Sequence, residues 1–333
     1  MLPDSDKTAS DKTGAIPLKN PNFFTIGVVK AGTSSLHHYL EQHPHVYMSP
    51  IKETNYFSRK DIDSSLFSKA YLNTVNVDLN KYLSSNMREK IHIAHITEEK
   101  DYLRLFSNVT NETAIGESSN SYILCEESPG LIHQAYPKAK IIIMLRNPVK
   151  RIFSHYLMNL RLGITLENDL ITELKNDQTR EINGWGANHQ YFSIGLYYEQ
   201  VKRVYDVFPA EQILLCYFED YQQDGAAIMK KIYHFLGVKD DFKPDLTEKI
   251  NVAGIAKFKI LNYLINYFGF FDLARRRLPV SWRKLFKKYW YTVDKKSIPV
   301  MSAEEKQYLV NYYREDIINL GKFLKKDLSH WLN

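Results

Sequence analysis

Cysteines and long apolar runs are scarce in this chain. Only two of its 333 residues are cysteine, Cys125 and Cys216, which are too few and too widely spaced for a disulfide framework or a cysteine-based metal site. No run of about 18 apolar residues occurs, which argues against a membrane-spanning helix. Residues 1–22 also lack the apolar centre of a secretion signal. We therefore expect a cytoplasmic protein without a transmembrane segment.

A large excess of charge of one sign is missing as well. The chain has 44 Lys and Arg residues against 38 Asp and Glu residues, which gives a net charge of +6. This balance favours an anionic ligand, but it is far below the charge density of a protein that coats nucleic acid. Because 44% of the residues are hydrophobic, the chain can bury a large core. We expect one large domain and no nucleic-acid partner.

Short apolar runs alternate with helical patterns over most of the chain. Runs of β-branched, aromatic and other apolar residues predict strands at 23–28, 114–117, 140–145 and 213–218. Helical patterns and helix-end signals predict helices at 34–42, 129–136, 148–160, 195–208 and 225–236. Because strands that alternate with helices form parallel sheets, we expect an α/β fold with a parallel, doubly wound sheet.

The two ends of the chain differ from this pattern. Residues 1–20 are polar, charged and aperiodic, which predicts a disordered tail before a single domain at 21–333. From about residue 250 onward the periodicity is helical only, so we expect a C-terminal helical cap at 250–333. Within it, the basic segment 275–288 mixes cations with large apolar residues, as a membrane-surface helix does. A solvated surface helix of the cap is the preferred interpretation of this segment.

A glycine-containing loop connects the first predicted strand to the first predicted helix. In such a loop, backbone N–H groups and the helix dipole form an anion-binding site. Lys30 adds a positive charge, and the start of the helix adds the hydroxyl groups of Thr33, Ser34 and Ser35. The loop of nucleoside triphosphatases, G-x-x-x-x-G-K-[ST], places its lysine after the second glycine, whereas Lys30 precedes Gly32 by two positions. The loop therefore favours a phosphate or phosphosulfate over a magnesium-bound triphosphate.

A second set of candidate anion-binding residues follows the strand at 140–145. Arg146 lies at the carboxyl end of this strand, and Arg151 and Ser154 lie on the helix that comes next. Ligands of open α/β sheets bind beyond the carboxyl ends of the strands, so both sets are expected to face one crevice. Arginine offers a planar fork and Ser154 a hydroxyl donor, although Arg151 fits a solvent-facing or carboxylate-paired role equally well. Two phosphate sites on one crevice indicate a nucleotide that is phosphorylated at both ends.

Together, these two segments resemble the superfamily of PAPS-dependent sulfotransferases, where PAPS is 3'-phosphoadenosine-5'-phosphosulfate. The first segment resembles the superfamily's 5'-phosphosulfate loop. The second is similar to its 3'-phosphate motif, R-x-P-x-x-R-x-x-S-x-Y, with Arg146, Pro148, Arg151, Ser154 and Tyr156 at the matching positions. The resemblance covers about residues 22–331 and implies a P-loop-like parallel β-sheet flanked by helices. It also implies PAPS as the donor, adenosine 3',5'-bisphosphate as the product, and no metal.

The same resemblance implies roles for individual residues. Lys30 would bind the 5'-phosphate and the bridging oxygen, and it would stabilise the leaving group. Other residues of the loop would hold the 5'-phosphate: Ala31, Gly32, Thr33, Ser34 and Ser35. Arg146 and Ser154 would hold the 3'-phosphate, and Tyr197 would approach the nucleotide. Lys257 occupies the region of the superfamily's lid lysine, which makes it the candidate contact from that lid.

An acceptor hydroxyl or amine needs a general base near the sulfur, because its proton has to leave as the new bond forms. The segment from Lys52 to Phe57 resembles the K-E-x-x-F-F segment of the carbohydrate-type branch, in which the glutamate is the base. Glu53 is therefore the predicted base. Cytosolic-type members use a histidine instead, so His92 and His95 are the alternatives, and His155 could line the crevice.

The sequence defines the acceptor less well. Heparan-type members have a lysine directly after the glutamate of the segment at 116–122, where this chain has Ser118. The missing cation disfavours an anionic sugar, so we expect a hydroxyl or amine of a small molecule or specialised metabolite, with a carbohydrate as the alternative. Glu117 could orient a polar or cationic acceptor or form a salt bridge within the fold. A kinase-like phosphoryl transferase and a non-catalytic nucleotide-binding protein remain as alternatives of other classes.

Overall fold

The computed structural model describes residues 19–67, 71–72, 75–182, 190–247, 259–268 and 298–333. Three predictions concern other parts of the chain and therefore lie outside the described residues. They are the disordered tail before residue 19, the lid contact of Lys257 and the basic segment 275–288. These three stay predictions.

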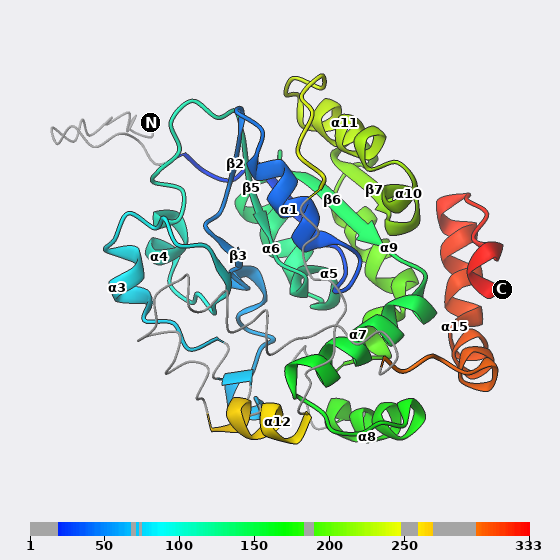
Figure 1. Ribbon diagram of the computed structural model, residues 1–333. Coiled ribbons are helices and arrows are strands. Elements are labelled where there is room, and N and C mark those ends of the chain that lie inside the picture. The colour runs from blue at the N-terminus through cyan, green and yellow to red at the C-terminus, as the bar shows by residue number, and fades with distance from the viewer. Residues whose placement is uncertain (1–18, 68–70, 73–74, 183–189, 248–258, 269–297) are drawn as a thin grey trace, which may run out of the picture.

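A five-stranded parallel sheet forms the centre of the molecule (Figure 1). Its strands lie in the order β2 (Val46–Met48), β5 (Ala114–Ser118), β1 (Phe23–Thr25), β6 (Lys140–Leu145) and β7 (Ile213–Tyr217). All neighbouring strands are parallel, which confirms the predicted sheet. In the central strand, Phe23 lies opposite Gly116 of β5 and Lys140 of β6. The loop that follows β1 therefore emerges in the middle of the carboxyl edge of the sheet.

Helices cover both faces of this sheet, and every residue of β1 and β5 is buried. One layer contains α1 (Thr33–Glu41) and α11 (Gly225–Leu236), where the Tyr233 hydroxyl donates to the Tyr39 carbonyl across 3.2 Å. The helices that pack together in the other layer are α5 (Ser121–Leu124), α6 (Ser128–Ala135) and α9 (Tyr197–Val207). The predicted helices at 34–42, 129–136, 148–160, 195–208 and 225–236 all form, with each end within two residues of the prediction.

A second, two-stranded sheet lies in a region where no strand was predicted. In it, β3 (Ile51–Glu53) pairs in parallel with β4 (Ile91–Ile93), and α3 (Leu79–Leu83) and α4 (Glu99–Arg104) flank β4 in the chain. Strands of three residues are too short to show an alternating pattern in the sequence. Glu53 is the last residue of β3, and its carbonyl accepts the N–H of Ala94 across 3.0 Å. The small sheet thus fixes the backbone of the predicted base.

The described C-terminal residues, 259–268 and 298–333, are mostly helical, as predicted. They contain α12 (Lys259–Tyr267), α15 (Ala303–Leu324) and the short 3-10 helix η6 (Ser329–Leu332). A capping box of Ser302 and Glu305 starts α15, which packs on α9 and on α7 (Pro148–Leu162). Beyond it, Trp331 is buried and its carbonyl accepts a hydrogen bond from Asn147, the N-cap of α7, across 3.3 Å. None of the helices in the described ranges is long and apolar enough to cross a membrane.

Candidate active site

The loop between β1 and α1 presents an open helix end at the edge of the sheet. Val28 still belongs to the strand ladder, since its N–H donates to the Met144 carbonyl across 3.0 Å. Beyond it, Lys30 and Gly32 adopt left-handed backbone conformations, with φ of 70° and 90°. Gly32 is the N-cap of α1, and no side chain caps this helix end. The first N–H groups of α1, beginning at Thr33, are therefore available to an anion.

The other residues of the loop differ in what they can offer a ligand. Ala31 is fully buried, and its N–H donates to the Val28 carbonyl across 3.1 Å, so this residue closes the turn. The Thr33 side chain is also buried. Ser34 and Ser35 are only half-buried at the start of α1. Their hydroxyl groups, next to the open N–H groups, are the ones that an anion can reach from outside.

Lys30 lies among other cations. Burial lowers the pKa of Lys30 to about 8, and the positive charges of Arg161 and Arg146 act in the same direction. Within the described residues, no carboxylate contributes an opposing effect to Lys30. A group of positive charges beside an open helix end is suited to an anionic ligand.

Arg146 joins the second predicted anion site to the first. It follows β6 directly, and its Nη1 donates to the Lys30 carbonyl across 2.8 Å. Its guanidinium lies over the Phe218 ring, 4.5 Å from the ring centre. Its buried Nε has no hydrogen-bond partner in the described part of the chain. The two predicted sites therefore meet at one edge of the sheet, where Arg146 still has a donor to offer.

Tyr197 supports Arg146 from within the fold. Its side chain is fully buried, and its hydroxyl donates to the Arg146 carbonyl across 2.8 Å. Its N–H donates to Asp316 of α15, also across 2.8 Å. The approach of Tyr197 to the nucleotide stays a prediction. Because its hydroxyl is used within the fold, Tyr197 acts on the site through the position of Arg146.

The residues of α7 divide between the interior and the crevice. Arg151 is fully buried, donates to the Tyr191 carbonyl, and has its Nη1 3.3 Å from Nδ1 of His155, which is buried too. Both of these residues therefore belong to the interior. Ser154 is half-buried, and Arg161 lies two helical turns after it on the same face. Arg161 was not predicted from the sequence, although its spacing of seven residues from Ser154 places both residues on the same face of a helix.

The carboxylate of Glu53 is anchored through one of its two oxygens. Its Oε1 accepts hydrogen bonds from Lys52 Nζ across 2.7 Å and from Asn120 Nδ2 across 2.8 Å. The Nε2 atom of His92 is 4.0 Å from the same oxygen. No described residue donates a hydrogen bond to Oε2 of Glu53. One oxygen thus fixes the side chain and the other can take a proton, as a general base requires.

Nearby charges keep Glu53 ionised. Burial would raise the pKa of Glu53, but the Lys52 ammonium and His92 outweigh it, so the pKa lies below its usual value. His92 lies at the outer side of Glu53, with its side chain 56% exposed. The other histidine, His95, has its Nε2 atom 3.3 Å from the Tyr71 hydroxyl. Glu53 and Val29, the residue before Lys30, line one pocket, so the base and the anion-binding loop belong to one site.

Residues 21–242 match the model of the Sulfotransferase family. The chain belongs to the sulfotransferase family. A sulfotransferase of known structure from Alicyclobacillus acidocaldarius has a TM-score of 0.69 and 28% identity, over 95% of this chain and 100% of that one. The human bifunctional heparan sulfate N-deacetylase/N-sulfotransferase 3 is 24% identical over 94% of this chain, and the human carbohydrate sulfotransferase 15 is 25% identical over 66%. The chain spans 31% and 44%, respectively, of the length of these two relatives.

This sulfotransferase has a second buried glutamate beside the base. Glu117 lies in β5, and its two oxygens accept the hydroxyl groups of Thr54 (2.7 Å), Ser119 (2.6 Å), Tyr122 (2.8 Å) and Tyr102 (2.8 Å). Burial raises the pKa of Glu117, although these hydrogen bonds oppose the shift. Both interpretations of Glu117 from sequence are corrected, because it is fully buried and its described hydrogen-bond partners are hydroxyl groups. It ties β5 to Thr54, the residue directly after the base.

Position 118 is enclosed in this sulfotransferase. Ser118 is 1% exposed, and its hydroxyl lies 3.3 Å from Nδ1 of His37, on α1. The place where heparan-type members have a lysine therefore holds a small side chain that packs against α1. Within the described ranges, no three His, Cys, Asp or Glu side chains gather as metal ligands would.

Proposed function

We propose that this sulfotransferase transfers a sulfuryl group from PAPS to a hydroxyl or amine of an acceptor and releases adenosine 3',5'-bisphosphate. One observation carries the proposal. Lys30 and Arg146, joined by a hydrogen bond, lie beside the uncapped start of α1, and Glu53 lines a pocket together with Val29, the residue before Lys30. A nucleotide with a phosphate group at each end would bind to the cations, and the carboxylate would serve the acceptor.

The residues present fit such a donor. The buried Nε of Arg146 has no partner within the described chain, and a phosphate oxygen supplies the acceptor that it lacks. We assign Arg146 and Ser154 to the 3'-phosphate. The open N–H groups of α1 and the hydroxyls of Ser34 and Ser35 suit the 5'-phosphate. Lys30 completes the set as the cation for the bridging oxygen.

In the proposed reaction, the acceptor oxygen or nitrogen forms a bond to sulfur while the bond between sulfur and the bridging phosphate oxygen breaks. The acceptor proton passes to Oε2 of Glu53, and the electron pair of the broken bond stays on the phosphate. The ammonium group of Lys30 stabilises the negative charge that develops on the phosphate oxygen by electrostatic attraction. Lys52 and Asn120 hold Glu53 in place through Oε1.

Other functions receive less support from the site. A kinase-like phosphoryl transferase needs its loop lysine after the second glycine, whereas Lys30 precedes Gly32 and its carbonyl accepts a hydrogen bond from Arg146. A non-catalytic nucleotide-binding protein would have no use for an anchored, ionised Glu53 beside the loop. A carbohydrate stays the alternative acceptor class, since the relatives include a heparan sulfate N-sulfotransferase and a carbohydrate sulfotransferase by name.

We also propose a cytoplasmic location. Both cysteines are free thiols, Cys216 buried in β7 and Cys125 half-buried after α5, as is usual in a reducing compartment. Contact of segment 275–288 with a membrane surface stays a secondary possibility, which rests on its sequence alone.

Isothermal titration with adenosine 3',5'-bisphosphate tests the donor site without any knowledge of the acceptor. We expect micromolar or tighter binding to the wild-type protein, and binding of AMP that is at least tenfold weaker because the 3'-phosphate is absent. Arg146→Ala should lose this preference, whereas Arg88→Ala, at an exposed position, should keep it. Equal binding of both nucleotides by the wild-type protein, or binding only of magnesium-ATP, would refute the proposal. With PAPS and an accepted substrate, Glu53→Gln should retain nucleotide binding and lose at least 100-fold in kcat.

A further inference from the structure

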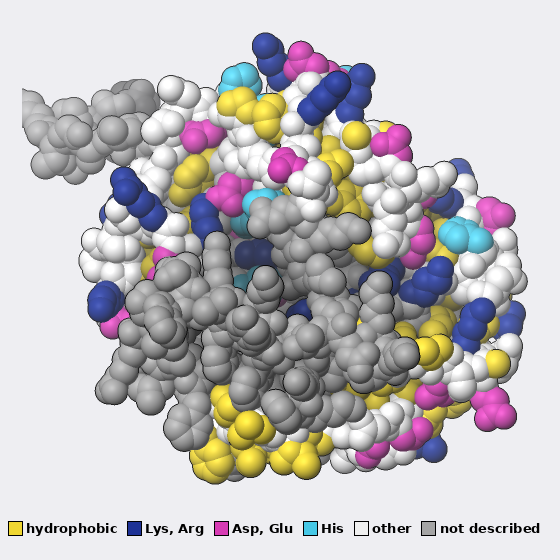
Figure 2. Space-filling model, in the orientation of Figure 1, with side chains coloured by type: hydrophobic (Ala, Val, Ile, Leu, Met, Phe, Trp, Pro, Cys, Tyr) yellow, Lys and Arg dark blue, Asp and Glu magenta, His cyan; other side chains and the backbone are white. Residues whose placement is uncertain are grey.

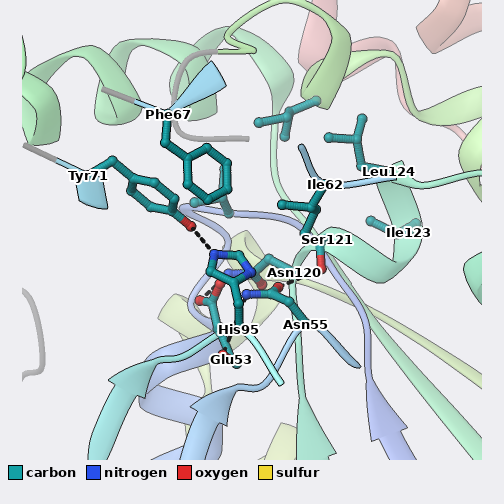
Figure 3. Close-up of a pocket in the computed structure, with 12 residues that line it drawn as sticks. Glu53, Asn55, Ile62, Phe67, Tyr71, His95, Asn120, Ser121, Ile123 and Leu124 are labelled. Carbon is teal, nitrogen blue, oxygen red and sulfur yellow. Dashed lines mark hydrogen bonds between the residues drawn. The ribbon is translucent and has the colours of Figure 1, made fainter. Parts of the chain in front are cut away.

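A pocket beside Glu53 combines a polar floor with an apolar wall (Figure 3). We infer that it is the acceptor site and that the acceptor is an uncharged alcohol or phenol with an apolar body. This inference rests on the proposed sulfuryl transfer and specifies its acceptor. The pocket lies between the base and the donor loop, since Glu53 and Val29, the residue before Lys30, both line it. A hydroxyl held here would meet both the base and the sulfuryl group.

The polar floor is built to receive one hydroxyl group. Figure 3 shows Glu53, Asn120 and His95 close together, with Tyr71 reaching His95 from the side. Asn120 donates to Oε1 of Glu53, so Oε2 is the oxygen left for the acceptor. The pKa of His95 is lowered by burial, and its ring is therefore neutral at pH 7. The floor thus offers a proton acceptor without adding a positive charge.

The wall of the pocket is apolar and comes from several parts of the chain. It consists of Val29, Ile62, Phe67, Ile123, Leu124 and Ile194. Phe67 and Ile194 are largely buried, whereas Ile62 and Leu124 are only half-buried and leave apolar surface open to the pocket. In Figure 3, Phe67 lies on one side of the pocket, and Ile62 and Leu124 lie on the other. An acceptor with an apolar body would cover these surfaces on both sides.

The charged residues that line the pocket also favour an uncharged acceptor. Glu53 is the one acidic residue among its described lining residues, and neither Lys nor Arg is among them. Lys52 is 5% exposed and already pairs with Glu53. An anionic sugar in this pocket would face the Glu53 carboxylate without a cation from the described wall to balance it. An ammonium acceptor would pair with Glu53 but could not attack sulfur before it lost a proton, so a neutral hydroxyl compound fits best.

The test measures binding to protein that is saturated with adenosine 3',5'-bisphosphate. The probes are straight-chain primary alcohols from 1-butanol to 1-octanol and an unsulfated heparan disaccharide. We expect affinity to rise about threefold to fourfold for each methylene that the pocket buries, until its length is filled. The disaccharide should bind more weakly than 1-octanol. An affinity that does not depend on chain length, or a disaccharide that binds more tightly than every alcohol, would overturn the inference.

A matched pair of variants places the effect in this pocket. Ile62→Ser removes apolar surface from the wall, and Ile318→Ser makes the same change at an exposed position of α15. We expect Ile62→Ser to weaken 1-octanol binding about fivefold to tenfold and to leave nucleotide binding unchanged. Ile318→Ser should change neither affinity. Equal alcohol affinity in the two variants would place the binding elsewhere and count against the inference.

Failure of this inference differs from failure of the proposed function. If the protein binds adenosine 3',5'-bisphosphate through its 3'-phosphate but prefers the disaccharide, the donor site stands and the acceptor class is wrong. If the nucleotide itself does not bind, the sulfotransferase mechanism fails before the acceptor is considered.

Discussion

The backbone carbonyl of Lys30 binds Arg146, whereas its side chain is proposed to bind the nucleotide. A left-handed conformation costs a non-glycine residue about 1–2 kcal/mol, and Lys30 adopts it with a φ of 70°. In this conformation its carbonyl accepts the Nη1 of Arg146, which links the two anion-binding segments. The ammonium group is thereby left to the ligand, among other cations that lower its pKa to about 8.

Nucleotide affinity should therefore depend on pH through the protonation of Lys30. Because the pKa of Lys30 in the free protein is about 8, the ammonium is charged at pH 7 and loses its proton as the pH rises above 8. We expect the affinity for adenosine 3',5'-bisphosphate to fall by up to about tenfold per pH unit between pH 8 and 9.5. Titration calorimetry over this range measures it. Lys30→Arg, which stays charged, should show a flat profile, and a wild-type profile that is equally flat would contradict the assignment.

Some residues of this site could be predicted from the sequence and others could not, depending on whether they lie in a recognisable sequence pattern. Lys30, Arg146 and Glu53 follow a strand or loop with a recognisable residue pattern, so they could be named in advance. The role of Tyr197 could not, because its hydrogen bond to the Arg146 carbonyl joins residues 51 positions apart. The wall of the acceptor pocket was equally hidden, since apolar residues such as Ile62 and Leu124 look like ordinary core residues in a sequence.

Among the elements, those with a strong periodic or apolar pattern were predicted and the short ones were not. The strand at 140–145 forms with the expected bounds because the five apolar residues that follow Lys140 mark a strand buried on both faces. β3 and β4 have three residues each and gave no such signal. α8 (Leu170–Ile182) was missed too, because it is polar overall.

Glu117 connects three of these elements, and its removal should be costly. Glu117→Ala leaves the hydroxyls of Thr54, Ser119, Tyr122 and Tyr102 without their shared acceptor. We expect the free energy of unfolding to drop by about 2–4 kcal/mol, measured by urea denaturation.

Glu117→Gln keeps the shape and one carbonyl acceptor, so it should stay within about 1 kcal/mol of the wild type. Glu127→Ala, which removes an exposed glutamate at the start of α6, is the control and should change little. If Glu117→Gln were as damaging as Glu117→Ala, the negative charge of Glu117 would be what the cluster needs, and the hydroxyl argument would be wrong.

At the scale of the whole molecule, the C-terminal helices support the site from outside the sheet (Figure 1). Asp316 of α15 accepts the N–H of Tyr197, and the Trp331 carbonyl accepts Asn147 at the start of α7. The space-filling view shows basic side chains near the centre of the face that it presents (Figure 2).

Truncation of one buried ring near the chain end should therefore affect the donor site. The Trp331 ring is 1% exposed and packs against Tyr197 and Tyr217, with ring centres 6.1 and 5.8 Å away. We expect Trp331→Ala to lower the free energy of unfolding by about 3–5 kcal/mol. The folded fraction should bind adenosine 3',5'-bisphosphate several-fold more weakly, because Tyr197 positions Arg146. Tyr308→Ala, at a 40% exposed position of α15, should leave both quantities nearly unchanged. If folded Trp331→Ala bound the nucleotide as tightly as the wild type, the proposed effect of Trp331 on the donor site would be wrong.

The contact between Trp331 and Asn147 also sets an order of events during synthesis. The ribosome makes Arg146 and Ser154 long before it makes Trp331, and domains begin to fold while the rest of the chain is still being translated. A nascent chain can thus assemble its sheet and its first phosphate loop, but α7 gains its last anchor only when Trp331 has left the exit tunnel. Donor binding at full strength therefore requires translation through Trp331, and we expect a product that stops before Trp331 to bind the nucleotide more weakly.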